Sequence, residues 1–190
     1  MTLRPGLAAL VILLATTAAL AHGDHGTPSL LHAFAGADHL LAALVVGLWA
    51  AWISRLDRRA LLVVPASFVT LVAAGAAAAW AGITLPLVEA GIWASVMLGG
   101  LVLLLLARPS IGLASAGVGL FALFHGQAHA IEAPGAEPAA YIAGILAGTV
   151  LLHAVGAVLG RALLTHVGAA GIRAAGALIA GIFTVSRVVS

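Results

Sequence analysis

Two short stretches of the sequence place imidazole and carboxylate side chains inside segments that are otherwise apolar. Their polar residues are His32, Asp38 and His39 in the first stretch, and His125, His129 and Glu132 in the second. A polar side chain at membrane depth is costly unless it is paired, hydrated or bound to an ion, so such residues mark a functional site by default. Imidazole nitrogens together with carboxylate oxygens suit borderline divalent metals such as nickel, cobalt and zinc. We therefore expect the two stretches to bind a divalent transition metal.

The spacing of the second stretch favours a common ligand face. His125, His129 and Glu132 recur at i, i+4 and i+7, which places them within about 60° of one another around a helix. In the first stretch, the two histidines at i and i+7 are likewise expected on one face. The carboxylate of Asp38 points about 100° away from His39 on such a helix. It either binds the same ion or orients a histidine through a hydrogen bond.

The donor types disfavour other metals. Copper(I) recruits cysteine or methionine, but the chain has no cysteine, and Met97 is its one methionine apart from Met1. Magnesium and calcium prefer oxygen ligands. We expect the metal to be the cargo of the protein and expect no prosthetic group.

The composition indicates a bilayer as the solvent. With 63% hydrophobic and 7% charged residues and a mean hydropathy of +1.21, the chain has too little polar surface to coat a soluble domain. Arginines slightly outnumber the acidic residues and lie between the apolar segments. Their positions therefore indicate membrane topology and not nucleic-acid binding. Lipid is the expected partner, and nucleic acid is not.

Residues 1–21 match a secretory signal peptide. Arg4 gives the positive start, residues 7–18 the apolar core, and Ala19-Leu20-Ala21 the cleavage signal. An uncleaved anchor is the alternative, although the apolar run is short for the about 20 residues that a span needs. After cleavage, His22 and His25 would lie at the mature N-terminus, where they either capture an ion or form a polar tail without that role.

Residues 22–190 are expected to form one all-α membrane domain. Six apolar segments are each long enough to cross about 30 Å of hydrocarbon: residues 30–53, 60–80, 86–107, 111–132, 139–159 and 167–185. A mature N-terminus on the outer side of a bacterial-type cytoplasmic membrane puts the loop arginines inside, as the positive-inside rule demands. These are Arg55, Arg58, Arg59, Arg108 and Arg161.

This topology places both polar stretches in the outer half of the membrane. The first span runs inward, so Asp38 lies about 12 Å below the outer surface. The fourth runs outward, so Glu132 lies at its outer end, with His129 and His125 one and two turns deeper. Glu89, at the start of the third span, reaches the same level. Three helices are therefore expected to converge on one metal site.

Other residues in the spans have more local interpretations. His153, deep in the fifth span, either forms a helix-to-helix hydrogen bond or lies on the ion path. Trp49 and Trp52 flank the inner end of the first span as an interface belt would. Arg173 is expected to snorkel to the inner surface or to pair with a helix carbonyl.

Small residues are expected to let the helices pack closely. Glycines spaced four apart, such as Gly144 with Gly148 and Gly156 with Gly160, supply faces where backbones approach. They predict a compact bundle but leave its oligomeric state undecided, a homo-oligomer included.

At the two polar stretches the chain resembles the HupE/UreJ family of nickel/cobalt permeases. The pattern H-x5-D-H matches residues 32–39, and the pattern F-H-G-x-A-H-G-x-E matches residues 124–132, with Ala130 where the pattern has glycine. The resemblance implies uptake of nickel, or in some members cobalt, with the six polar residues of the two stretches at the motif positions. It also implies a cleaved signal and six spans.

Two other functions are weighed against transport. An intramembrane metal-dependent hydrolase would use the same ligands to activate water, but no serine or tyrosine is clearly placed near the cluster to complete its site. A haem b protein would need axial histidines from two helices. The sequence decides neither nickel against cobalt nor the energy coupling, although it has no Walker motif for nucleotide binding.

Overall fold

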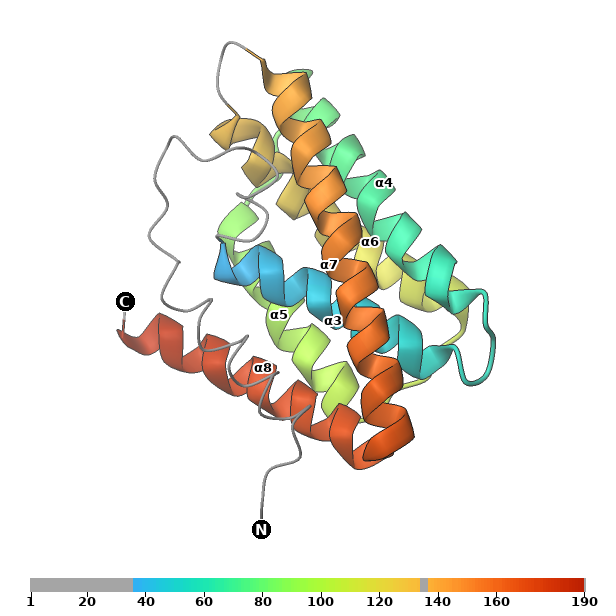
Figure 1. The fold of residues 1–190 in the computed structure, drawn as a ribbon. Coiled ribbons are helices and arrows are strands. Elements are labelled where there is room, and N and C mark those ends of the chain that lie inside the picture. The colour runs from blue at the N-terminus through green and yellow to red at the C-terminus, as the bar shows by residue number, and fades with distance from the viewer. Residues whose placement is uncertain (1–35, 134–136, 190) are drawn as a thin grey trace.

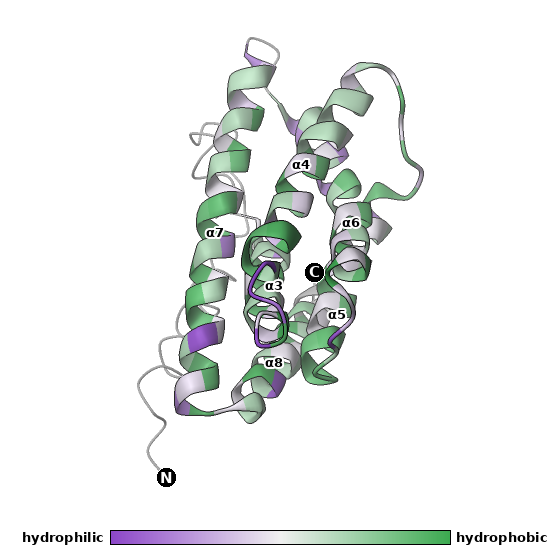
Figure 2. Ribbon diagram, turned by 90° about the vertical axis from the view of Figure 1, so that its right-hand side faces the viewer, coloured by the Kyte–Doolittle hydropathy of each residue, from purple (hydrophilic) through white to green (hydrophobic). Residues whose placement is uncertain are grey.

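The computed structural model describes residues 36–133 and 137–189. Within this part of the chain all secondary structure is helical: α3 (Ala37–Ile53), α4 (Ala60–Trp80), α5 (Val88–Leu104), α6 (Ile111–Glu132), α7 (Pro138–His166) and α8 (Ala169–Val189). Three helices, α4, α6 and α7, are long and apolar enough to cross a membrane, and the other three are shorter apolar helices. Figure 2 shows hydrophobic residues along the helices and hydrophilic ones mainly near their ends and in the loops. The all-α prediction is confirmed.

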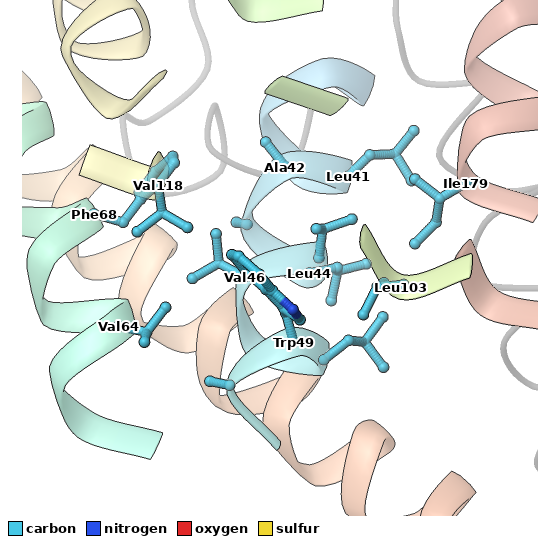
Figure 3. Close-up of a cluster of buried hydrophobic side chains, with 14 of the residues drawn as sticks. Leu41, Ala42, Leu44, Val46, Trp49, Val64, Phe68, Leu103, Val118 and Ile179 are labelled. Carbon is cyan, nitrogen blue, oxygen red and sulfur yellow. The ribbon is translucent and has the colours of Figure 1, made fainter. Parts of the chain in front are cut away.

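Helix α3 lies at the centre of the bundle (Figure 1). Every residue from His39 to Ile53 is buried. Figure 3 shows its side chains meeting Val64 and Phe68 of α4 on one side and Leu103 of α5 on another. Because α3 is surrounded by protein, all of its faces are apolar, whereas a helix at a surface has a single apolar stripe.

Glycines lie at the contacts of three closely packed helix pairs. They are Gly47 and Gly156 between α3 and α7, Gly75 and Gly126 between α4 and α6, and Gly100 and Gly176 between α5 and α8. A Cβ atom at any of these positions would collide with or crowd the backbone of the partner helix. Small residues therefore set the close approach of the helices, as expected for packing in lipid.

The C-terminal end of α3 is tied to the segment that follows α5. The indole Nε1 of Trp49 donates to the carbonyl of Ala107 at 2.9 Å, and that of Trp52 donates to the carbonyl of Leu106 at 3.0 Å. The guanidinium of Arg108 stacks 3.6 Å from the centroid of the Trp52 ring. Both tryptophans are buried, 8% and 3% exposed, so the predicted interface belt is wrong. Their N–H groups instead satisfy carbonyls left unpaired beyond a helix end.

Arg173 has a similar role. Its Nε donates to the carbonyl of Leu104, the last residue of α5, at 3.2 Å. This contact agrees with the expected pairing of Arg173 with a helix carbonyl. A positive charge beside the C-terminus of a helix is also electrostatically favourable.

The predicted segments match the helices closely in four of six cases, and two boundaries were wrong. The first helix begins at Ala37 and not at residue 30, since Gly36 has extended backbone at φ −77° and ψ 116°. The fifth helix continues to His166, seven residues beyond its predicted end. Arg161 was assigned to a loop, but it lies on an exposed helical face. The turn comes at Gly168, whose φ of +77° is one that glycine adopts without strain.

Candidate metal site

A cluster of three histidines joins α3 to α6. The Nδ1 atom of His39 lies 2.9 Å from the Nε2 atom of His129, and the ring centroids of His39 and His125 are 5.5 Å apart. All three rings are buried, with exposed fractions of 3%, 2% and 5% for His39, His125 and His129. The Nδ1 atom of His129 lies 3.1 Å from Oε2 of Glu132, toward the end of α6. The two polar stretches thus meet in space.

Two hydroxyl groups fix which nitrogen of each histidine carries the proton. Thr149 Oγ1 donates to a carbonyl of its own helix at 2.8 Å, so its contact of 2.9 Å with His39 Nε2 must be a bond that it accepts. Ser95 Oγ donates to a carbonyl of α5 at 2.6 Å and accepts from His125 Nε2 at 2.9 Å in the same way. Nδ1 of His39 then accepts from the Nε2–H of His129, and Nδ1 of His125 is the nitrogen of that ring without a proton. Such orientation of a ligand by an outer partner is typical of metal sites.

Acidic residues lie at the rim of the cluster. Oδ1 of Asp38 accepts from the backbone N–H of His39 at 2.7 Å, so this carboxylate lies at the positive N-terminal end of α3. Glu89, in the first turn of α5, and Glu132 line a surface groove of about 550 Å³ together with Trp93. Two carboxylates, one from α5 and one from α6, therefore share one groove.

Gln127 positions the segment that leads to Glu89. Its Oε1 accepts from the backbone N–H of Leu85 at 2.8 Å, and its Nε2 donates to the carbonyl of Ile83 at 2.7 Å. The side chain is 2% exposed. Because both backbone groups would otherwise lack a partner, these bonds hold the chain between α4 and α5 against α6.

His153 lies apart from the hydrogen-bonded cluster. It is 3% exposed, and neither of its ring nitrogens has a hydrogen-bond partner in the described part of the chain. Its ring packs edge-on against Phe68, with centroids 5.3 Å apart. The alternative in which His153 forms a helix-to-helix hydrogen bond is therefore wrong.

Several predictions about the site have different outcomes. His22, His25 and His32 lie outside the described residues. The helix that carries His39 starts at Ala37, and the helical face expected to be shared by His32 and His39 stays a prediction because His32 is not among the described residues. Within residues 36–133 and 137–189, no three His, Asp or Glu side chains surround a common point that could hold an ion. The acids and histidines contact one another in pairs instead.

Sequence reasoning missed the hydroxyl groups at the cluster. The argument that no serine is placed near the histidines was wrong, because Ser95 contacts His125. Its hydroxyl hydrogen, however, is bound to a helix carbonyl. The available signal was that Ser95 and Thr149 lie inside apolar runs, where a hydroxyl needs a partner.

Buried histidines at the junction of apolar helices define an integral membrane protein with a polar site in its core. A family model described as HupE / UreJ protein matches residues 10–185. The chain is also 39% identical over 160 residues to Protein HupE of Rhizobium leguminosarum bv. viciae, a match that covers 84% of this chain and 82% of the relative. The chain belongs to the HupE/UreJ family, whose members are transporters of metal ions and not enzymes. No solved structure matches it.

Proposed function

We propose that this chain is a permease that takes up nickel, or alternatively cobalt, across the cytoplasmic membrane. In this proposal His39, His125, His129 and Glu132 form an outer metal site, and Asp38 and Glu89 supply negative charge at its rim. His32 is a further ligand, and His22 and His25 at the mature N-terminus capture the ion. The metal is cargo and not a prosthetic group.

The observation that carries the proposal is the contact between His39 Nδ1 and His129 Nε2. A metal bound by two imidazoles at about 2.1 Å and a right angle holds their nitrogens about 3 Å apart. The two nitrogens are 2.9 Å apart, although they point at each other. Loss of the proton that His129 Nε2 donates to His39 Nδ1, together with rotation of the rings and without movement of α3 or α6, would direct both lone pairs toward one ion. Right-angled nitrogen and oxygen ligation is typical of nickel(II).

The distribution of charge supports the direction of transport. Glu89 and Glu132 line the groove at one end of the bundle, while Arg59 and Arg108 line a groove of about 580 Å³ at the other. Carboxylates at the outer mouth attract a divalent cation, and arginines at the inner end satisfy the positive-inside rule. An inward-negative potential favours uptake by about 2.3 kcal/mol per charge per 100 mV.

The topology is part of the same proposal. All six helices cross the membrane, residues 1–21 are removed as a signal peptide, and the mature N-terminus lies outside. The shorter helices α3 and α5, each of 17 residues, span about 25 Å. They can cross because they are packed against longer neighbours, α3 against α4 and α7, and α5 against α6 and α8.

Uptake of labelled nickel into proteoliposomes tests the function. We expect the wild type to accumulate nickel, cobalt to compete, and zinc to compete less. His129→Ala and Asp38→Ala should lose most of the uptake. His166→Ala, in the last turn of α7 far along the helix from Thr149, is the matched histidine control and should keep it. Wild-type accumulation in both His129→Ala and Asp38→Ala would contradict the site.

A further inference from the structure

His153 is a buried polar side chain without a hydrogen-bond partner in the part of the chain that the structure describes. Its ring is 3% exposed, and within the described chain both nitrogens lack a hydrogen-bond partner. Leaving such groups unpaired lowers stability, and the great majority of buried polar atoms are paired. Leucine would fill a similar space without this cost. Packing alone therefore does not explain a histidine at this position.

The position of His153 continues the line of the outer cluster into the membrane. On α7, it lies one turn further along than Thr149, the residue that accepts from His39 Nε2. On α3, the backbone of His153 packs against Gly47, which is eight residues, or about 12 Å of helix, beyond His39. His153 is therefore deeper in the bundle than the three clustered histidines.

One aromatic ring connects the two levels. The centroid of Phe68 lies 5.6 Å from that of His125 and 5.3 Å from that of His153. Phe68 is 2% exposed, and Figure 3 shows it at the core, close to Val118. Phe68 therefore contacts both His125 and His153, and the face of an aromatic ring attracts cations.

We infer that His153 is a second metal-binding station, which receives the divalent ion from the outer cluster and binds it through an imidazole nitrogen. The inference rests on the proposed transport function. Water completes the coordination of the ion at this station, because a single imidazole with water binds weakly enough to release it. A weak station suits conduction, which requires that each site also lets the ion leave.

The substitution His153→Leu tests the second station while leaving the outer site intact. We expect nickel uptake into proteoliposomes to fall about tenfold or more, since the imidazole that lowers the inner barrier is gone. Equilibrium binding of nickel to the purified protein should stay as in the wild type, because His39 and His129 are intact. The melting temperature should be unchanged or higher. Leu152→Met, a buried neighbour on α7 at 3% exposure, is the control for disturbed packing and should transport normally.

The outcomes distinguish this inference from the proposed function. Normal uptake by His153→Leu, while His129→Ala is inactive, would overturn the second station and leave the outer site in place. Loss of nickel binding or of cooperative melting in both His153→Leu and His153→Gln would show a structural role and equally overturn it. A wild type that accumulates no nickel would instead contradict the proposed function itself.

Discussion

Replacement of Thr149 by valine tests whether the cluster depends on a fixed histidine tautomer. Thr149 is fully buried at 0% exposure, and valine has nearly the same shape but no hydroxyl. The Nε2–H of His39 would lose its acceptor, and an unsatisfied buried donor costs about 1–3 kcal/mol. If the ring turns to recover this energy, Nδ1 no longer faces His129, and if it changes tautomer, Nδ1 carries the proton and has no lone pair for a metal. Loss of such an outer partner weakens metal binding about 10–100-fold.

The assay is equilibrium dialysis of the purified protein against nickel, with initial uptake rates in proteoliposomes beside it. Thr165→Val is the matched control, because Thr165 Oγ1 also donates to a carbonyl one turn earlier on α7, at 2.9 Å, but lies at an exposed position far from the cluster. Thr149→Ser should restore binding. Equal nickel affinities in Thr149→Val and Thr165→Val would refute the reasoning.

Two further predictions concern the scaffold. Gly126→Ala should lower the free energy of unfolding by about 1–3 kcal/mol, because its Cβ would collide with the backbone carbonyl of Val72. Thermal unfolding measures this. Gly117→Ala, where a Cβ meets nothing within 4 Å, is the control and should leave stability unchanged or raise it by up to about 1 kcal/mol. In the loop before α4, hydrogen bonds from the Arg59 side chain and backbone hold the pKa of the exposed Asp57 below its ordinary 3.8. The ion pair therefore stabilises the fold above that pH, and the stabilisation is lost as pH falls through the lowered pKa. Asp57→Asn should melt only slightly below the wild type at neutral pH, and the difference should vanish once the pH falls below the lowered pKa of Asp57. A larger difference in acid than at neutrality would contradict it.

The sequence predicted the helices well where apolar runs end at charged or turn-forming residues. The segment that ends at Trp80 and the one that starts after Ser110 were placed correctly. The predicted start of the first helix was wrong because apolar residues lie on both sides of Gly36, whose extended backbone is not helical. Hydropathy shows only that a segment is apolar enough for lipid or for a protein core. It therefore does not distinguish a short helix buried in the bundle from a longer helix that faces lipid.

The candidate site was predictable in part for a related reason. The helical spacing of the polar residues, and the opposite directions of the first and fourth predicted spans, were enough to expect His39 and His129 at a similar depth in the bundle. The partners from other helices were not predictable, since nothing local to Ser95 or Thr149 indicates which histidine each will meet. That His153 has no hydrogen-bond partner among the described residues depends likewise on how α3 and α4 pack around it, which its own sequence neighbours do not indicate.

X-ray absorption at the nickel edge tests the central claim most directly, since it observes the ligands of the ion in the purified protein. The proposed site predicts the scattering of imidazole rings at about 2.1 Å from the metal, and the loss of that signal when His39 and His129 are both replaced by alanine. Nickel without imidazole ligands, or an unchanged spectrum in the double variant, would contradict the assignment of this cluster as the outer metal site.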